Sequence, residues 1–194
     1  MDTVVITDGK YRSSIAAARA LGRSGYQVTV TQTRDDQKLE PPVFSSRYVR
    51  EGCWLEGGAA DQDYPDRLYN LLERYDRPVL FCAGASTLNA VAKERERFAQ
   101  ICDFLIAPPE ALDALNDKER VHRRCVELGI PVPQEFDGMP DRFPVIIKPH
   151  CGEKFGLKAK DRYAVARNAQ EYADKRTDMV SYDPATIVQE KVEG

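Results

Sequence analysis

Lysine and glycine residues that could bind an anionic ligand gather in residues 144–158. A β-branched run at Val145–Ile147 predicts a buried strand, and the Pro-His-Cys-Gly sequence after Lys148 predicts a turn. Alternation along the strand places Lys148 on the same face as Ile146, so an ammonium group lies beside apolar surface. This combination suits a ligand with anionic groups and a flat apolar part, such as a nucleotide. The alternative is a solvated lysine at the end of an edge strand.

A second lysine, Lys118, is predicted in the first turn of a helix. Asn116 would cap this helix, and Glu119 follows three residues later as in a capping box. The positive end of the helix dipole disfavours a cation in the first turn, so Lys118 fits best where an anion lies nearby. A solvated surface lysine is again the alternative.

The elements around these lysines form a small α+β subdomain. Pro108-Pro109 interrupts the pattern of the preceding chain, and the helix at Lys118 has Val121, Cys125 and Leu128 on one face before it ends at Gly129. Further along the chain we expect a hairpin strand at 157–160, a helix from the Asn168 cap to about Met179, and a last strand at 185–190. We therefore place a domain boundary between residues 1–107 and 108–194.

The first 107 residues alternate between strand and helix. Strands are predicted at Val4–Ile6 and Gln27–Val30, with a helix between them at about 11–21. The pattern continues with a short strand at 47–50 and a helix from Asp63 or Tyr64 with a buried stripe reaching Tyr75. It is completed by strands at 79–82 and 103–106 and by a capped turn at 84–87 before a further helix. The expected fold is an open, parallel, Rossmann-like α/β sheet of four or five strands.

In such a sheet, ligands bind at the carboxyl ends of the strands. The loops 8–14 and 83–87 are at these ends, so Asp8, Arg12 and Ser86 are candidate contacts for a small substrate. Gly9 stands alone without a Gly-x-Gly-x-x-Gly fingerprint, which disfavours a nicotinamide enzyme. Residues 52–58 have the glycine spacing of a phosphate loop but no lysine, so we interpret them as an ordinary loop.

The composition narrows the function classes. A hydrophobic content of 42% supports a real core, whereas a net charge of −3 without a basic block argues against nucleic acid and membrane partners. The N-terminus has no signal or membrane-spanning segment, so a cytoplasmic protein is expected. Five scattered cysteines predict reduced thiols, and two histidines without a ligand partner predict no histidine metal site. His150 and Cys151 could form a base and nucleophile pair, but we interpret them as incidental loop residues.

The order and spacing of these motifs resemble the ATP-grasp superfamily. The resemblance is carried by Asn116-Asp-Lys118, then Gly129-Ile-Pro-Val-Pro133, then Phe143-Pro-Val-Ile-Ile-Lys148-Pro, then a loop with Gly152 and Gly156, and finally Val188-Gln-Glu190-Lys-Val-Glu-Gly194. The first half is similar to the pre-ATP-grasp domain and the second to the first nucleotide-binding subdomain. The carbamoyl-phosphate-synthase-like and carboxylate–amine ligase branches are the most similar.

The resemblance implies roles for individual residues. Lys118 and Lys148 match the lysines that hold the nucleotide phosphates, and Glu190, Lys191 and Val192 match the hinge that contacts adenine through backbone groups. The loop with Gly152, Lys154 and Gly156 matches the flap over the phosphates, although it has fewer glycines than is usual. Chemistry agrees with the lysine roles, since phosphoryl transfer needs several cations around the phosphate oxygens.

The implied function is that of an ATP-dependent ligase that activates a small-molecule carboxylate as an acyl phosphate for attack by an amine or a thiol. ATP and Mg²⁺ are the implied cofactors, and a homodimer is a possible assembly. The Mg²⁺ ligands and the catalytic arginine of the superfamily fall after Gly194, so we expect a truncated chain that is inactive alone and binds ATP weakly. The alternative is a non-catalytic nucleotide-binding or assembly module.

Overall fold

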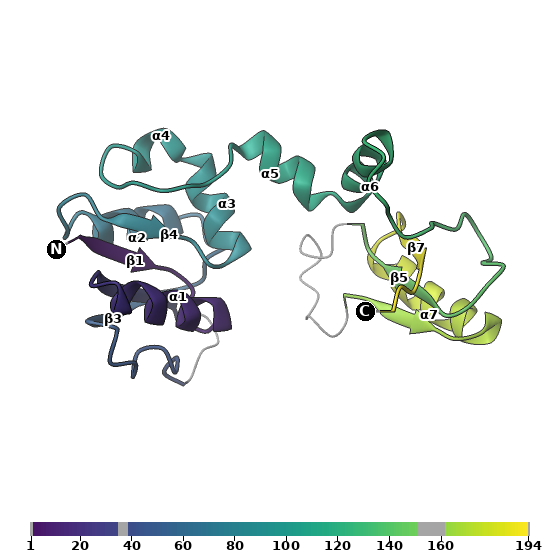
Figure 1. The fold of residues 1–194 in the computed structure, drawn as a ribbon, viewed down its shortest axis with the longest axis horizontal. Coiled ribbons are helices and arrows are strands. Elements are labelled where there is room, and N and C mark those ends of the chain that lie inside the picture. Colours follow the sequence, from purple (N-terminus) through teal and green to yellow (C-terminus); the bar gives the residue numbers. More distant parts are fainter. Residues whose placement is uncertain (1, 35–38, 151–161, 194) are drawn as a thin grey trace. The chain divides into compact units, whose positions relative to one another are not determined.

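The computed structural model describes residues 2–34, 39–150 and 162–193 and divides the chain into two compact units, residues 1–109 and 110–194 (Figure 1). The first unit contains a four-stranded sheet in the order β3-β2-β1-β4, and each pair of neighbouring strands is parallel. The strands are β1 (Thr3–Ile6), β2 (Gln27–Thr33), β3 (Glu51–Leu55) and β4 (Val79–Phe81). The open parallel α/β sheet expected from the sequence is confirmed.

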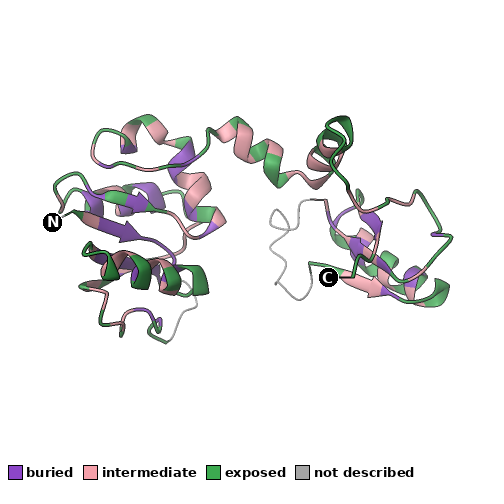
Figure 2. Cartoon of the chain, in the orientation of Figure 1, coloured by how far each residue is buried: buried purple, intermediate pink, exposed green. Residues whose placement is uncertain are grey.

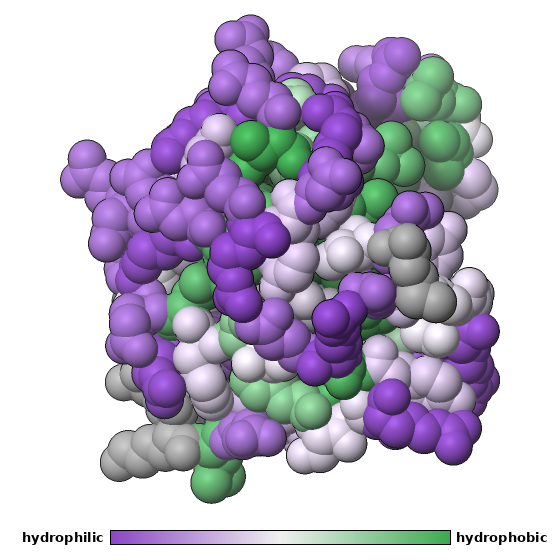
Figure 3. All heavy atoms as spheres, turned by 90° about the vertical axis from the view of Figure 1, so that its left-hand side faces the viewer, coloured by the Kyte–Doolittle hydropathy of each residue, from purple (hydrophilic) through white to green (hydrophobic). Residues whose placement is uncertain are grey.

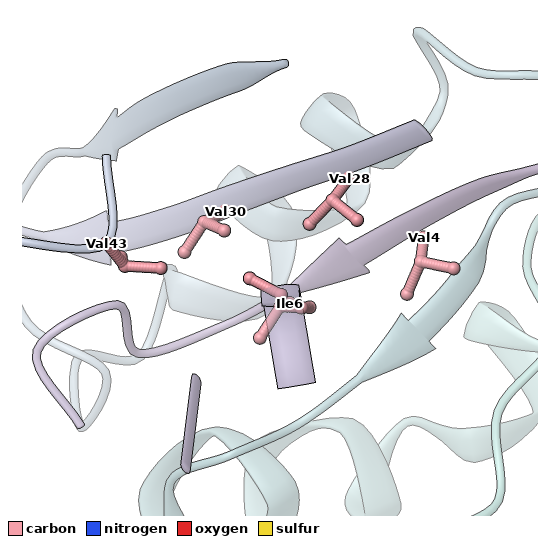
Figure 4. Packing of buried hydrophobic residues seen from close by; sticks show 6 residues of the cluster. Val4, Ile6, Val28, Val30 and Val43 are labelled. Carbon is pink, nitrogen blue, oxygen red and sulfur yellow. The ribbon is translucent and has the colours of Figure 1, made fainter. Parts of the chain in front are cut away.

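Helices cover this sheet, and its central strands β1 and β2 are buried on both faces. The helices of the first unit are α1 (Arg12–Arg23), α2 (Tyr64–Leu72), α3 (Ala85–Lys93) and α4 (Arg95–Phe98). On the face that α1 covers, a cluster of buried side chains comprises Val4, Ile6, Ala18, Val28, Val30 and Val43 (Figure 4). On the other face, Thr29 Oγ1 lies 3.2 Å from the hydroxyl of Tyr75, which follows α2. Helix α2 therefore ends before Tyr75, earlier than predicted.

The third strand corrects two predictions. Residues 47–50 form turns, and the segment interpreted as a loop contains β3, whose residues Glu51–Leu55 pair with Thr29–Thr33 of β2. The longer β2 supplies these partners, and Gly52 allows the close approach of Phe44. A Cβ atom at Gly52 would lie 2.5 Å from Phe44 Cγ. A glycine that resembled a loop signal thus serves close packing within a strand.

The predicted strand at 103–106 is also wrong. Among the described residues, only Asp103 of this segment pairs, in a single parallel bridge with Val79. The Asp103 carboxylate binds Arg77 at 2.7 Å, and the Leu105 side chain is fully exposed. The segment therefore lacks the second buried face that a strand beside β4 would need.

The second unit contains a three-stranded antiparallel sheet in the order β6-β5-β7. Its strands are β5 (Val145–Lys148), β6 (Ala164–Ala166) and β7 (Ile187–Glu190), and its helices are α5 (Pro109–Asn116), α6 (Lys118–Glu127) and α7 (Ala169–Tyr182). Val145 and Ile147 are completely buried in a cluster with Tyr172 and Met179 of α7. Ile146 and Lys148 lie on the opposite, half-buried face, as the alternation predicted.

Local signals at the helix ends were partly right. Asn168 caps α7, since its side chain accepts a hydrogen bond from Glu171 N at 2.9 Å. The cap of α6 is Asp117, which accepts from Arg120 N at 3.0 Å, because Asn116 is already the last residue of α5. Leu128 was expected in a buried stripe but is 55% exposed. The hairpin strand predicted at 157–160 falls outside the described residues.

The surface is mostly polar. One face shows predominantly hydrophilic residues with small hydrophobic areas between them (Figure 3). Buried residues concentrate in the strands, whereas the outer side of α1 is exposed (Figure 2). No helix in the described part of the chain is long and apolar enough to cross a membrane.

Candidate functional site

Two lysines that are thirty positions apart in the sequence meet in the second unit. Lys148 ends β5, and Lys118 begins α6. The Lys118 ammonium donates hydrogen bonds to the carbonyl oxygens of Pro149 at 3.0 Å and of His150 at 3.4 Å. The backbone N–H of Lys118 also donates to the His150 carbonyl at 3.3 Å. The first turn of α6 is thereby attached to the residues directly after Lys148.

The two ammonium groups are close enough to repel each other. Burial lowers the pKa of Lys148, the positive charge of Lys118 lowers it further, and the carboxylate of Glu135 opposes both effects. Two like charges on a half-buried surface cost free energy unless an anion lies between them. This arrangement can therefore bind an anion with several oxygen atoms.

The same face of the sheet carries three further polar groups. Gln189 lies opposite Ile146 in the β5–β7 pair and is 6% exposed. Its amide donates to Glu135 Oε1 at 2.7 Å, and the same carboxylate oxygen lies 3.2 Å from His122 Nδ1 of α6. Glu135 thus supplies a negative charge beside Lys148 and is itself held in place by two neighbours.

The predicted hinge follows β7. The Glu190 carboxylate accepts from Gln134 N at 2.9 Å and pairs with Arg142 at 3.0 Å, and Lys191 N donates to the Pro144 carbonyl at 3.2 Å. The Val192 side chain is 61% exposed. The side chain of Glu190 and the backbone N–H groups of Glu190 and Lys191 are therefore engaged within the chain.

His150 has a specific partner that the sequence interpretation missed. Its Nδ1 atom lies 2.7 Å from Asp183 Oδ2, and its backbone N–H donates to the same oxygen at 2.8 Å. Asp183 is 2% exposed. His150 is therefore held in place by Asp183, and its interpretation as incidental to catalysis stays a prediction. Cys151 and the flap residues Gly152, Lys154 and Gly156 lie outside the described residues.

In the first unit, the loops after β1 and β4 meet, and Asp8 connects them. Its carboxylate accepts hydrogen bonds from Gly84 N at 2.9 Å, from Thr87 Oγ1 at 3.1 Å and from the Thr7 hydroxyl. Asp8 is 8% exposed and has a positive φ of 58°. Helix α3 begins at Ala85 without a side-chain cap, because its N-cap residue is Gly84, and Thr87 in its first turn binds Asp8.

The other two substrate candidates are at the surface. Arg12 and Ser86 are exposed in the first turns of α1 and α3, beside the loops that Asp8 joins. Both oxygens of the Asp8 carboxylate already have partners within the chain, whereas Arg12 and Ser86 are accessible to a ligand. Arg12 and Ser86 are therefore accessible for direct contact with a ligand, whereas the Asp8 carboxylate is engaged within the chain.

A metal site is not formed by the residues that the structure describes, among which no three His, Cys, Asp or Glu side chains gather to hold an ion. Beside the two lysines, the carboxylate that influences Lys148 is Glu135, which hydrogen bonds to Gln189. Such a donor set does not provide the several free oxygen ligands that Mg²⁺ requires.

Sequence reasoning missed Glu135, Gln189, His122 and Asp183. One signal was available for Gln189, a polar residue in an apolar strand whose alternation faces it away from α7. Asp183 and Glu135 are in segments without periodicity, and their partners are 33 and 54 residues away. No local pattern could have identified these pairs.

Comparisons with known proteins identify the fold. No family model and no curated protein matches the sequence. Biotin carboxylase of Campylobacter jejuni, described as a β,γ-ATP complex, has a TM-score of 0.61 at 14% identity over 99% of this chain and 45% of its own. The biotin carboxylase domain of Hydrogenobacter thermophilus 2-oxoglutarate carboxylase, described with MgADP and bicarbonate, gives 0.60 at 13% over 99% and 44%. D-Alanine-D-alanine ligase of Helicobacter pylori gives 0.52 at 12% over 100% and 67%.

These similar structures are ATP-grasp enzymes, so the chain has an ATP-grasp-like fold. The chain spans less than half of the length of the biotin carboxylase chains. At such low identities the similarity concerns the fold alone.

Proposed function

We propose that this chain is part of an ATP-dependent ligase that joins a carboxylate to an amine or a thiol, and that Lys118 and Lys148 bind the phosphates of its nucleotide. The observation that carries the proposal is that the Lys118 ammonium binds the carbonyl oxygens of Pro149 and His150, directly after the half-buried Lys148, at 3.0 and 3.4 Å. Repulsion between the Lys118 and Lys148 ammonium groups is unfavourable when no ligand is bound, whereas a polyphosphate between them attracts both groups.

The register of the sheet supports a nucleotide over a small anion. Lys148 lies opposite Ile187, and Val145 lies opposite Glu190, so the hinge and Lys148 are at opposite ends of the β5–β7 pair. Three residue steps separate these ends by about 10 Å. This separation suits a base at the hinge and phosphates at the lysines. The half-buried Ile146 offers apolar surface on the same face between them.

Two successive displacements make up the proposed reaction. A carboxylate oxygen of the substrate attacks the terminal phosphorus of ATP, the bond to the bridging oxygen breaks, and ADP leaves. The amine or thiol then attacks the acyl carbon, phosphate leaves, and the nucleophile loses its proton. Lys118 and Lys148 contribute by neutralising negative charge on the phosphate oxygens and holding them in place.

The remaining parts of the proposal concern Mg²⁺ and the carboxylate. Mg²⁺ would supply further positive charge at the phosphates, held by ligands other than the described carboxylates. Arg12 and Ser86, exposed at the carboxyl edge of the first sheet, are proposed contacts for the carboxylate substrate. Asp8 belongs to this proposal as the residue that holds the two loops together.

Nuclear magnetic resonance titration of the chain with Mg-ATP tests the phosphate site, because this method detects weak binding. We expect shifts at Lys118, Lys148 and residues 190–192, and an affinity loss of about tenfold or more in Lys148→Met. The matched control is Lys93→Met, which removes an exposed lysine from the first unit. Absence of shifts at both lysines at millimolar ATP would refute the site.

The ligase activity is tested separately with the complete gene product. ATP-dependent release of phosphate that requires a carboxylate and an amine or thiol supports the ligase. Nucleotide binding without any such turnover favours the non-catalytic module.

A further inference from the structure

A buried aspartate and a histidine connect three elements of the second unit. Asp183 follows α7, and its Oδ2 atom binds both the backbone N–H and the ring Nδ1 of His150 at 2.8 and 2.7 Å. Its Oδ1 atom accepts from Ala185 N at 3.0 Å, just before β7. Because Asp183 is only 2% exposed, this network fixes both the backbone and the ring orientation of His150.

His150 in turn holds the start of α6. Its carbonyl oxygen accepts from the backbone N–H and the ammonium of Lys118, at 3.3 and 3.4 Å, while the Pro149 carbonyl accepts from the same ammonium at 3.0 Å. A continuous chain of hydrogen bonds therefore runs from Asp183 through His150 to Lys118. The position of the Lys118 ammonium depends on where Asp183 holds the His150 backbone.

We propose that the Asp183–His150 pair positions Lys118 for nucleotide phosphates. This inference rests on the proposed function and adds two positioning residues to it. Because Nδ1 faces a carboxylate at 2.7 Å, it carries the hydrogen and donates it to Asp183.

The charged groups near the ring come from two sides. Asp183 is before β7, whereas Asp117 and Lys118 are at the start of α6.

Two replacements of His150 test the positioning. His150→Asn retains a side-chain N–H near the position of Nδ1, so it can still bind Asp183. His150→Ala removes this hydrogen bond. Asp183→Asn keeps the shape of the buried group and serves as a second variant if His150→Ala does not fold.

The first experiment measures the ATP dissociation constant of the whole chain and of both His150 variants in identical buffers. We expect His150→Ala to bind ATP about fivefold more weakly than the wild-type chain, and His150→Asn to bind with near wild-type affinity because it keeps the hydrogen bond to Asp183. Equal affinities of His150→Ala and the wild-type chain overturn the positioning of Lys118 for phosphates.

The second experiment needs no nucleotide. Hydrogen exchange of the Lys118 amide, corrected for the intrinsic pH dependence, reports its bond to the His150 carbonyl. We expect faster exchange in His150→Ala and Asp183→Asn, and near wild-type exchange in His150→Asn. Unchanged exchange in the first two variants overturns the positioning role.

The two experiments also separate this inference from the proposed function. If neither the wild-type chain nor any variant binds ATP, the proposed function fails, and the exchange measurement still decides whether the pair positions Lys118.

Discussion

Replacement of Asp8 by alanine tests whether this residue holds the first unit together. The carboxylate joins the loop after β1 to the loop after β4 through Gly84 N at 2.9 Å and Thr87 Oγ1 at 3.1 Å. The Thr7 hydroxyl also donates to it. Gly84 is required at this approach, since a Cβ atom there would lie 2.6 Å from Asp8 Cγ.

The expected loss follows from these contacts. A hydrogen bond to a buried charged group contributes about 1.5–3 kcal/mol, and part of each loss is recovered when water reaches the freed donors. We therefore expect Asp8→Ala to lower the free energy of unfolding by about 3–5 kcal/mol. For a unit of this size, that corresponds to a fall in Tm of at least about 12 °C. Asp8→Asn should lose about 1–2 kcal/mol, because asparagine keeps one acceptor and tolerates the positive φ.

Thermal unfolding followed by circular dichroism measures this effect. The control is Arg12→Ala, which removes an exposed side chain and should change the free energy of unfolding by no more than about 0.5 kcal/mol. An Asp8→Ala chain that unfolds at the wild-type temperature would show that these hydrogen bonds contribute nothing, and Asp8 would then be free to serve as a substrate contact.

Two further predictions concern titration and reactivity. Burial alone would raise the pKa of Asp183, but hydrogen bonds from His150 and Ala185 outweigh burial and lower it below its ordinary value of 3.8. The stabilisation from Asp183 is thus complete above pH 3.8 and is lost as the pH falls through the lower pKa of the folded state. The free energy of urea unfolding between about pH 5 and 3 should therefore depend less on pH in Asp183→Asn than in the wild-type chain. Parallel curves for the two chains would contradict this. Burial raises the pKa of the Cys53 and Cys102 thiols to about 11 from 9.0, so native-state alkylation near pH 8, read by mass spectrometry, should be about a hundredfold slower at these residues than after unfolding. Equal rates before and after unfolding would contradict the prediction.

Local sequence patterns were sufficient for much of the fold. The apolar run Val4–Ile6 predicted a strand, and the alternation at Val145–Lys148 predicted that Ile146 and Lys148 share one face, and the structure confirms both. Asn168 was recognised as a cap because its side chain binds a backbone N–H only three residues away. Signals of this kind depend on neighbours within one or two turns, so the sequence contains them directly.

Segments whose structure depends on distant partners were interpreted wrongly. Gly52 resembled a loop residue, yet it lies in β3, because β2 extends to Thr33 and Phe44 packs against the glycine. The segment at 103–106 resembled a strand, but among the described residues only Asp103 of this segment pairs. Residue periodicity and β-propensity show only that a segment can form a strand. Whether the segment pairs as a strand depends on the neighbouring strand that the fold places beside it.

The sequence by itself determined the fold class and the two lysines as candidates, because strand alternation and residue type are local properties. Only the tertiary structure decided what surrounds them. It brings Lys118 to the residues after Lys148, pairs Glu135 with Gln189, and joins His150 to Asp183. Burial makes such polar contacts strong, and burial depends on segments that are 31 to 54 residues apart.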